Sequence, residues 1–214
     1  MKVFTLLRFT GKQIRRQIKN FIQSYCLYQF NQNTGNDIQS PDVNLACIKG
    51  NNISVQKGSY ISGDSQIGSY TYIGFNNLIS KSSIGRYCSL ASNVNIGHGE
   101  HPVNNISTST LFLDFPYEIL TAKDCVIGND VWIGVSCIIR RGVTIGDGAI
   151  VGANSFVNKD VPPFAIVAGS PAQIIRFRFA PEKIEKILAS CWWDHPLQTA
   201  KKIINDLEID KENN

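Results

Sequence analysis

The sequence predicts a mainly β solenoid, in which short strands form successive coils, with helices at both ends. Three observations predict it: aliphatic residues recur every six positions, one long segment interrupts them, and helical apolar patterns stand near both termini. An α-helix brings together residues three and four apart and an ordinary strand alternates every two, so neither alone produces a period of six. An antiparallel β-sandwich is the alternative, but its strands do not keep one phase through many consecutive units.

The six-residue period runs unbroken through the second half of the chain at Ile127, Ile133, Ile139, Ile145, Val151 and Val157. The first half has the same spacing with one step shortened by a residue, at Val55, Ile61, Ile67, Ile73, Ile79, Ile84, Leu90 and Ile96. We expect each of these side chains to point into a central stack shared with the neighbouring coils. Glycine follows many of them, and we expect it to let the backbone bend at a corner of the coil.

The segment from Gly97 to Asp124 interrupts the repeat. Interruptions of a repeat scaffold usually carry the function, because the repeats themselves build the framework. The segment contains two histidines, a polar run and an aromatic stretch, and its aromatic content argues against disorder. We expect it to protrude as a loop and to pack against a neighbouring subunit.

Helical patterns are predicted on both sides of the repeats. Residues 11–29 form an amphipathic pattern with a basic face; we favour a helix that caps the first coil, and a weak contact with a membrane surface is the alternative. Two helices are expected after the repeats, one from Pro181 and one from Pro196 to Leu207. Their inward residues, expected to cap or flank the open end of the solenoid, are Ile184, Ile187, Leu188, Ala200, Ile203 and Ile204.

Composition excludes several classes of protein. The formal net charge is only +4, with much of the excess in the first 20 residues, so the bulk of the chain is not a nucleic-acid binder. The six cysteines are scattered without metal-binding spacing and are interpreted as reduced packing residues, with no metal expected. We find no secretory signal and no stretch long enough to span a bilayer, so the expected compartment is the cytoplasm.

Four segments of the second half carry a resemblance to a known family. Residues 126–134 (VIGNDVWIG), 142–150 (GVTIGDGAI), 158–163 (NKDVPP) and 168–172 (AGSPA) resemble the hexapeptide-repeat acetyltransferases. The resemblance implies a left-handed parallel β-helix with three hexads per coil, a homotrimer with three shared active sites, and acetyl-CoA as the acyl donor. On this basis we expect a helical arm and cap in residues 1–45, the acetyltransferase domain in residues 46–180 with the loop 97–124, and C-terminal helices in residues 181–214.

Acetyl transfer from a thioester to a hydroxyl group needs a base that works near neutral pH, a task that suits histidine. In the family the base is a histidine in the loop that leaves the solenoid, commonly just before a proline, and this position corresponds to His101. His98 is the other histidine of the loop, and we assign it to acceptor binding together with Phe112, Phe115 and Tyr117, whose rings can stack on a sugar or a drug. His195 is interpreted as part of a structural helix junction.

The resemblance also implies residues for the acetyl-CoA groove between two subunits. Trp132 and Gly134 are expected to flank the pantetheine arm, and Ala153 is expected to offer backbone polar groups. The remaining positions, expected near phosphate groups, are Asn158, Lys159 and Arg176.

The sequence does not decide between two classes of acceptor, a saccharide and a drug. The His-Pro and Ser-Thr-Ser-Thr pattern of the loop resembles sugar and polysaccharide O-acetyltransferases, whereas residues 84–89 (IGRYCS) and 192–194 (WWD) resemble the chloramphenicol and streptogramin acetyltransferases. We favour a saccharide, because the loop has Gly-His-Gly-Glu where the drug-modifying branch often has an asparagine-rich stretch. A non-enzymatic or metal-binding β-solenoid is the alternative of another class.

Overall fold

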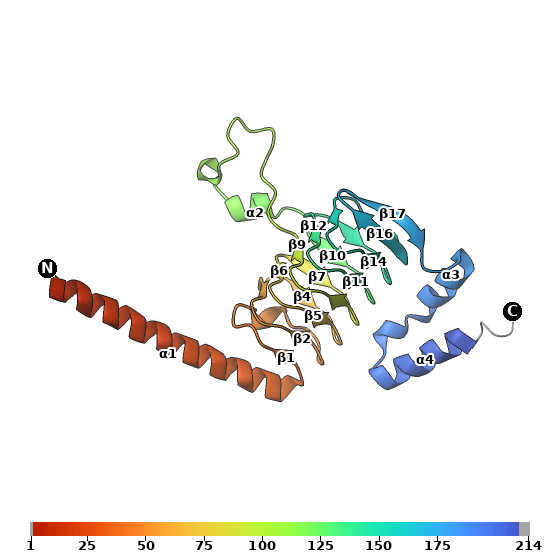
Figure 1. The fold of residues 1–214 in the computed structure, drawn as a ribbon, viewed down its shortest axis with the longest axis horizontal. Helices are drawn as coiled ribbons and strands as arrows, with labels where there is room; N and C mark the ends of the chain where they lie inside the picture. Colours follow the sequence, from red (N-terminus) through yellow and green to blue (C-terminus); the bar gives the residue numbers. More distant parts are fainter. Residues whose placement is uncertain (1, 210–214) are drawn as a thin grey trace.

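The computed structural model describes residues 2–209, with side chains from Gln13 onward, and its centre is a coil of short strands that form three sheets (Figure 1). Sheet 1 has the order β1 (Asp37–Ile38), β2 (Ser54–Val55), β5 (Tyr72–Ile73), β8 (Ser89–Leu90), β11 (Trp132–Ile133), β14 (Ile150–Val151), β16 (Ala165–Gly169) and β17 (Ala172–Phe177). Sheet 2 consists of β3 (Tyr60–Ile61), β6 (Leu78–Ile79), β9 (Asn95–Ile96), β12 (Ile138–Ile139) and β15 (Phe156–Val157). Sheet 3 consists of β4 (Gln66–Ile67), β7 (Ser82–Ile84), β10 (Cys125–Ile127) and β13 (Thr144–Ile145).

The predicted column of aliphatic side chains is confirmed as the core. Strands of successive coils pair in parallel with matched register, so that Ile67 lies beside Ile84, Ile84 beside Ile127, and Ile127 beside Ile145. The antiparallel pair β16–β17 ends the stack. The inward residue of each parallel strand is almost fully buried, as at Ile133 with 0% exposure. The three hexads of each coil therefore contribute one side chain each to a shared interior.

The shortened step between Ile79 and Ile84 is absorbed at one corner. Lys81 adopts a positive φ of 42° there, and β7 still pairs in register with β4 and β10. The spacing in sequence therefore changes without any change in the column of buried side chains.

The glycines that follow the aliphatic residues have a different purpose from the predicted one. Gly85 and Gly134 do not have a positive φ; the corners bend instead at residues two positions further along, such as Tyr87 (58°) and Ser136 (58°). A Cβ atom on Gly134 would lie 2.6 Å from the backbone nitrogen of Ala153 in the next coil. These glycines are required because adjacent coils approach too closely for a side chain, and the prediction of corner flexibility is wrong.

The N-terminal helix α1 (Lys2–Thr34) is longer than the predicted 11–29, and it caps the solenoid only with its last turns. Leu27 and Phe30 pack against the core, and the side chain of Asn31 exchanges two hydrogen bonds of 3.0 Å with the backbone of Ile38. The rest of the helix extends away from the coils (Figure 1). No helix within residues 2–209 has the length and apolar character that crossing a membrane requires.

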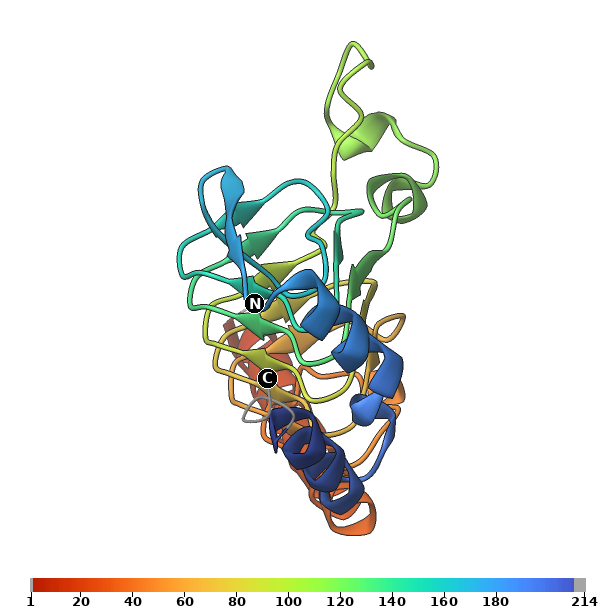
Figure 2. The same ribbon diagram turned by 90° about the vertical axis from the view of Figure 1, so that its right-hand side faces the viewer.

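The C-terminal helices α3 (Pro181–Ser190) and α4 (Leu197–Ile209) form a second, smaller core with the short 3-10 helix η3 (Trp192–Asp194). They pack against Phe164 and Tyr87 of the solenoid, and Figure 2 shows them on one side of the coils. The predicted inward residues are confirmed: Ile187 and Ala200 are buried, and the others pack beside them. A further 3-10 helix, η1 (Leu45–Cys47), lies in the first coil.

Candidate active site

Residues 97–124, called the lobe below, leave the solenoid after β9 and return at β10, at the corner between sheets 2 and 3. They contain η2 (Thr110–Phe112) and the short helix α2 (Pro116–Leu120), and they project clear of the coils (Figures 1 and 2). Gly97 begins the lobe with a positive φ of 67°. A Cβ atom there would lie 2.6 Å from the carbonyl oxygen of Ser80, so the chain can turn out of the stack only with glycine at this position.

The imidazole of His101 is held in one tautomer. Its Nδ1 lies 2.6 Å from the carbonyl oxygen of Thr108. Since a carbonyl can only accept a hydrogen bond, Nδ1 carries the proton and donates a hydrogen bond to the carbonyl oxygen of Thr108. The lone pair of the neutral ring is therefore on Nε2, and the side chain is exposed. This is the arrangement that a general base requires, because the accepting nitrogen is fixed in direction by the bond on the other side of the ring.

The other two histidines are arranged differently. His98 Nε2 lies 3.2 Å from Oδ1 of Asn95, on the outer face of β9, so its Nε2 donates rather than accepts. His195 follows η3, and its carbonyl oxygen accepts hydrogen bonds from the Tyr87 hydroxyl (2.8 Å) and the Arg86 guanidinium (3.2 Å). Of the three, only His101 combines a carbonyl-bound Nδ1 with a position within the lobe.

The aromatic residues assigned to acceptor binding lie on the lobe surface. Phe112 is 75% exposed and Phe115 is 67% exposed. Tyr117 is engaged within the chain, since its hydroxyl donates a 2.5 Å hydrogen bond to Oδ2 of Asp64 at the corner between β3 and β4. Tyr117 therefore ties α2 of the lobe to the solenoid, while half of its surface stays open.

The contact between Tyr117 and Asp64 should be visible in a titration. The hydrogen bond to Asp64 raises the pKa of Tyr117 to about 12. Because the pKa in the folded protein lies above the ordinary value near 10, the contact stabilises the lobe fully below about pH 10 and is lost as the pH rises through about 12. We expect Asp64→Ala to lower the pH at which one tyrosine ionises, measured by phenolate absorbance. Tyr117→Phe should abolish that same transition, and a transition that persists in Tyr117→Phe would contradict the assignment.

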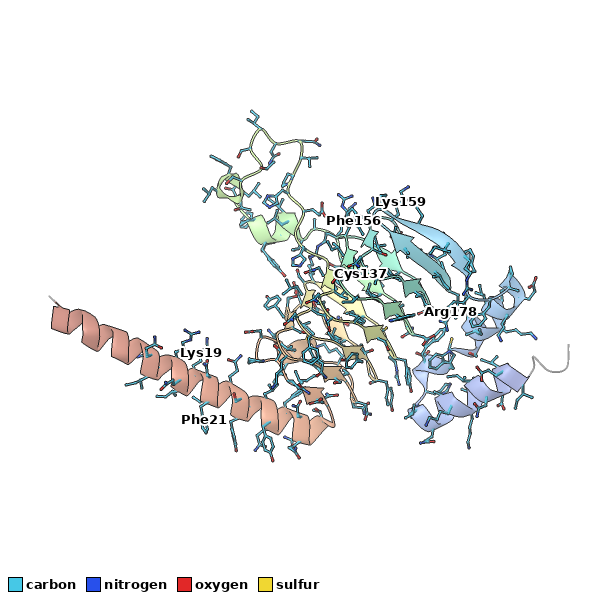
Figure 3. The ribbon with its side chains drawn as sticks, viewed as in Figure 1. Lys19, Phe21, Cys137, Phe156, Lys159 and Arg178 are labelled. Atoms are coloured by element: carbon cyan, nitrogen blue, oxygen red, sulfur yellow. The ribbon has the colours of Figure 1, made fainter. Side chains whose placement is uncertain are left out.

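Four of the six residues expected to bind acetyl-CoA lie at two corners of the last coils. Gly134 and Ala153 are stacked neighbours at the corner between sheets 1 and 2. Asn158 and Lys159 follow β15 at the corner between sheets 2 and 3, the same corner from which the lobe leaves. Figure 3 shows Lys159 near the turn beyond Phe156. The outer face of sheet 2 therefore lies between the pair Gly134 and Ala153 and the pair Asn158 and Lys159.

Two further residues of the predicted donor site lie on sheet 1. Trp132 points outward from β11 and is 55% exposed, between Ser89 and Ile150 of the adjacent strands. Arg176 is exposed on β17, where its guanidinium donates to the carbonyl oxygen of Phe177 (3.1 Å). Within one chain the predicted donor residues are thus spread over two corners and one sheet.

Sequence reasoning missed Arg141, which holds the base of the lobe. Arg141 is only 7% exposed and follows β12 at the corner between sheets 2 and 3. Its guanidinium donates to the carbonyl oxygens of His98 (3.5 Å) and Lys123 (3.0 Å), at the two ends of the lobe. It also donates to the carbonyl oxygens of Lys81 (3.1 Å) and Ser80 (3.1 Å) in the coil below. The signal available in the sequence was a second arginine beside Arg140, soon after the inward residue Ile139.

Arg140 binds the lobe from outside. Its guanidinium forms an ion pair of 3.0 Å with Glu100, the residue before His101. Both side chains are about half exposed, so water screens the pair and its contribution to stability is small. Arg141 and Arg140 therefore contact the same segment from a buried and an exposed position.

Other features of the described residues lie away from the lobe. A cavity of about 220 Å³ between α3, α4 and the last coils is lined by Asp130, Arg178 and Trp192 among others, and none of the predicted site residues borders it. Within residues 13–209, no three His, Cys, Asp or Glu side chains gather as metal ligands do. All six cysteines are free, and four of them are buried.

Comparisons with known proteins show which family the chain is similar to. The family described as "Bacterial transferase hexapeptide (six repeats)" matches residues 124–159. Chloramphenicol acetyltransferase of Agrobacterium fabrum is 38% identical over 171 residues, covering 72% of this chain and 81% of the relative. Galactoside O-acetyltransferase of Escherichia coli is 33% identical over 159 residues, covering 70% of this chain and 74% of the relative.

The crystal structure of AntD, an N-acyltransferase from Bacillus cereus in complex with dTDP and 3-hydroxybutyryl-CoA, superimposes with a TM-score of 0.56. Its sequence is 22% identical, and the match covers 72% of this chain and 82% of AntD, so the similarity is one of fold. The solenoid is a left-handed parallel β-helix, as the sequence resemblance implied.

The extent of these matches defines the class of protein: this chain belongs to the hexapeptide-repeat acetyltransferase family. It is an enzyme that transfers an acyl group, as the sequence predicted.

Proposed function

We propose that this acetyltransferase transfers an acetyl group from acetyl-CoA directly to a hydroxyl group of a saccharide, with His101 as the general base. The observation that carries the proposal is the hydrogen bond from His101 Nδ1 to the carbonyl oxygen of Thr108, which leaves Nε2 as a fixed proton acceptor at the exposed surface of the lobe.

The reaction balances without a covalent enzyme intermediate. His101 Nε2 accepts the proton of the acceptor hydroxyl while the oxygen attacks the thioester carbonyl. The tetrahedral intermediate then collapses, the C–S bond breaks, and the thiolate of CoA leaves and receives the proton from the imidazolium. The cysteines support direct transfer: burial raises the pKa of Cys88 to about 12, and the exposed Cys26 and Cys191 lie on α1 and beside α3, outside the lobe.

The donor site in this proposal lies in the groove between two subunits. Trp132, Gly134 and Ala153 flank the pantetheine arm, and cationic or amide side chains meet the phosphates: Asn158, Lys159 and Arg176. A groove between subunits accounts for the spread of these residues over two corners and sheet 1 of one chain. His98, Phe112, Phe115 and Tyr117 contact the acceptor.

A homotrimer completes the site. Large apolar side chains cover the lobe, including Val103 at 85% and Leu111 at 89% exposure. Apolar side chains also stand on the outer face of sheet 2, at Tyr60, Leu78 and Ile138, with Asn95 between the last two. Covering both surfaces with neighbouring subunits buries apolar area that a lone chain leaves in water. The reduced cysteines support a cytoplasmic location.

A drug acceptor is the second candidate, because the identity to chloramphenicol acetyltransferase (38%) exceeds that to galactoside O-acetyltransferase (33%). A saccharide remains the proposal because the lobe carries the Gly-His-Gly-Glu-His-Pro sequence and exposed aromatic rings suited to sugar faces.

A thiol-release assay separates the two candidates. The purified protein is given acetyl-CoA with mono- and oligosaccharides, nucleotide sugars, chloramphenicol or a streptogramin, and CoA release is measured against a sample without acceptor. We expect release with one or more saccharides and an acetyl ester in the product by mass spectrometry. Release with the drugs alone would overturn the saccharide assignment. A failure to bind CoA in calorimetry would overturn the donor assignment.

A further inference from the structure

The helix α1 has two parts with different surroundings. Its C-terminal turns are attached to the first coil through Leu27, Phe30 and Asn31, and the side chain of Gln23 donates to the carbonyl oxygen of Pro41. The preceding turns extend beyond the solenoid (Figure 1). The acetyl-transfer site described above uses no residue of this helix.

Helix α1 carries an apolar stripe over residues 14–28. At 100° per residue, the exposed large apolar side chains of this range fall within an arc of about 120°. All of them are more than half exposed: Ile14, Ile18, Phe21, Ile22, Tyr25 and Tyr28. Leu27 and Phe30, which face the solenoid, lie on the other side of the helix in this projection. The stripe therefore points away from the solenoid.

The charges next to the stripe all have one sign. The first 36 residues contain six basic and no acidic side chains, more positive charge than the +4 of the whole chain. The basic residues with described side chains, Arg15, Arg16 and Lys19, are exposed, and Figure 3 shows Lys19 and Phe21 on opposite sides of the helix. A helix with a cationic face and an aromatic and aliphatic stripe matches the boundary of a bilayer that has anionic headgroups above and acyl chains below.

We propose that α1 binds the surface of an anionic lipid bilayer, lying in the interface with its apolar stripe toward the acyl chains and its basic side chains at the headgroups. The positive charge of this segment determines which partner fits α1. Two copies of a segment without any acidic residue repel each other, and a nucleic acid would satisfy the basic side chains but leave the apolar stripe in water. An anionic membrane complements both features. This inference does not depend on the identity of the acceptor.

Vesicle flotation with the full-length protein tests the proposal. The probes are unilamellar vesicles of phosphatidylcholine alone and of phosphatidylcholine with an equal part of phosphatidylglycerol, at low and high NaCl concentration. We expect the protein to float with the anionic vesicles at low salt, and binding to weaken at high salt and on vesicles without anionic lipid. Equal binding to both kinds of vesicle, or none to either, would overturn the proposal.

Two pairs of variants locate the contact. Ile18→Glu with Phe21→Glu should abolish flotation, whereas Ile209→Glu on α4, a residue of similar exposure, should not change it. Arg15→Gln with Lys19→Gln should weaken binding about fivefold for each side chain replaced. The matched control is Lys201→Gln with Lys202→Gln on α4, where both lysines are exposed.

A second copy of the chain is the competing occupant, and the same variants detect it. The Ile18 and Phe21 side chains make no contact with the buried core, so circular dichroism should show an unchanged melting temperature. Light scattering of the variant with Ile18→Glu and Phe21→Glu should show the same mass as the wild type. A smaller assembly together with unchanged flotation would assign α1 to subunit contact and overturn the membrane proposal.

Discussion

Replacing His101 with alanine is expected to lower kcat by about 10²- to 10⁴-fold, because a positioned general base contributes that much to the rate. The affinity for CoA should stay near the wild-type value, since in the proposed reaction His101 contacts the hydroxyl proton rather than the donor. Steady-state kinetics of CoA release and calorimetric titration with CoA measure the two quantities. The residual rate should depend weakly on pH, because the group that accepts the proton is gone.

The other histidines provide the comparison. His195→Ala should leave kcat unchanged, because the hydrogen bonds of that residue use its backbone: the carbonyl oxygen accepts from Arg86 and Tyr87, and the N–H donates to Trp192. His98→Ala should raise KM for the acceptor with a smaller effect on kcat, since its Nε2 is a donor. If His101→Ala lost CoA affinity in proportion to kcat, His101 would be a donor-binding residue instead. If His98→Ala had the larger effect on kcat, the base would be assigned to the wrong histidine.

The solenoid could be predicted because its six-residue period depends only on which type of residue stands at every sixth position. Every sixth side chain is aliphatic, and stacking superimposes these positions whatever the corners do, as the intact register across the Ile79 to Ile84 step shows. The purpose of the glycines could not be predicted in this way. The distance between Gly134 and Ala153 depends on how tightly two coils pack, and that distance does not appear in a six-residue pattern.

The candidate site was predictable only in part, for a related reason. The interruption of the repeats places two histidines in the lobe, and the family resemblance selects His101. Its tautomer, however, is set by the carbonyl oxygen of Thr108, seven residues away in an irregular segment. Arg141 is 43 residues from His98, and its role depends on carbonyl groups, which every residue possesses. Contacts that use the backbone as a partner leave no mark on the sequence of that partner.

Arg141→Met is expected to destabilise the protein by about 3 kcal/mol. The substitution keeps much of the buried volume but removes the donors for the carbonyl oxygens at both ends of the lobe, and hydrogen bonds to a charged group contribute about 1.5–3 kcal/mol each. Urea unfolding measures the change. Arg140→Met is the matched control; its ion pair with Glu100 is exposed, so the free energy of unfolding should fall far less than in Arg141→Met.

The same variant tests whether Arg141 positions the base or only supports the fold. If Arg141→Met displaces the base of the lobe by about 1 Å, that displacement is enough to lower kcat by about 10²-fold. The affinity for CoA should not change. In a chain that already carries His101→Ala, Arg141→Met should then have little further effect on kcat, because the group that it positions is absent. A purely structural role would instead lower kcat by the same factor in both backgrounds. The two substitutions must therefore be non-additive in kcat and additive in stability if Arg141 acts through His101.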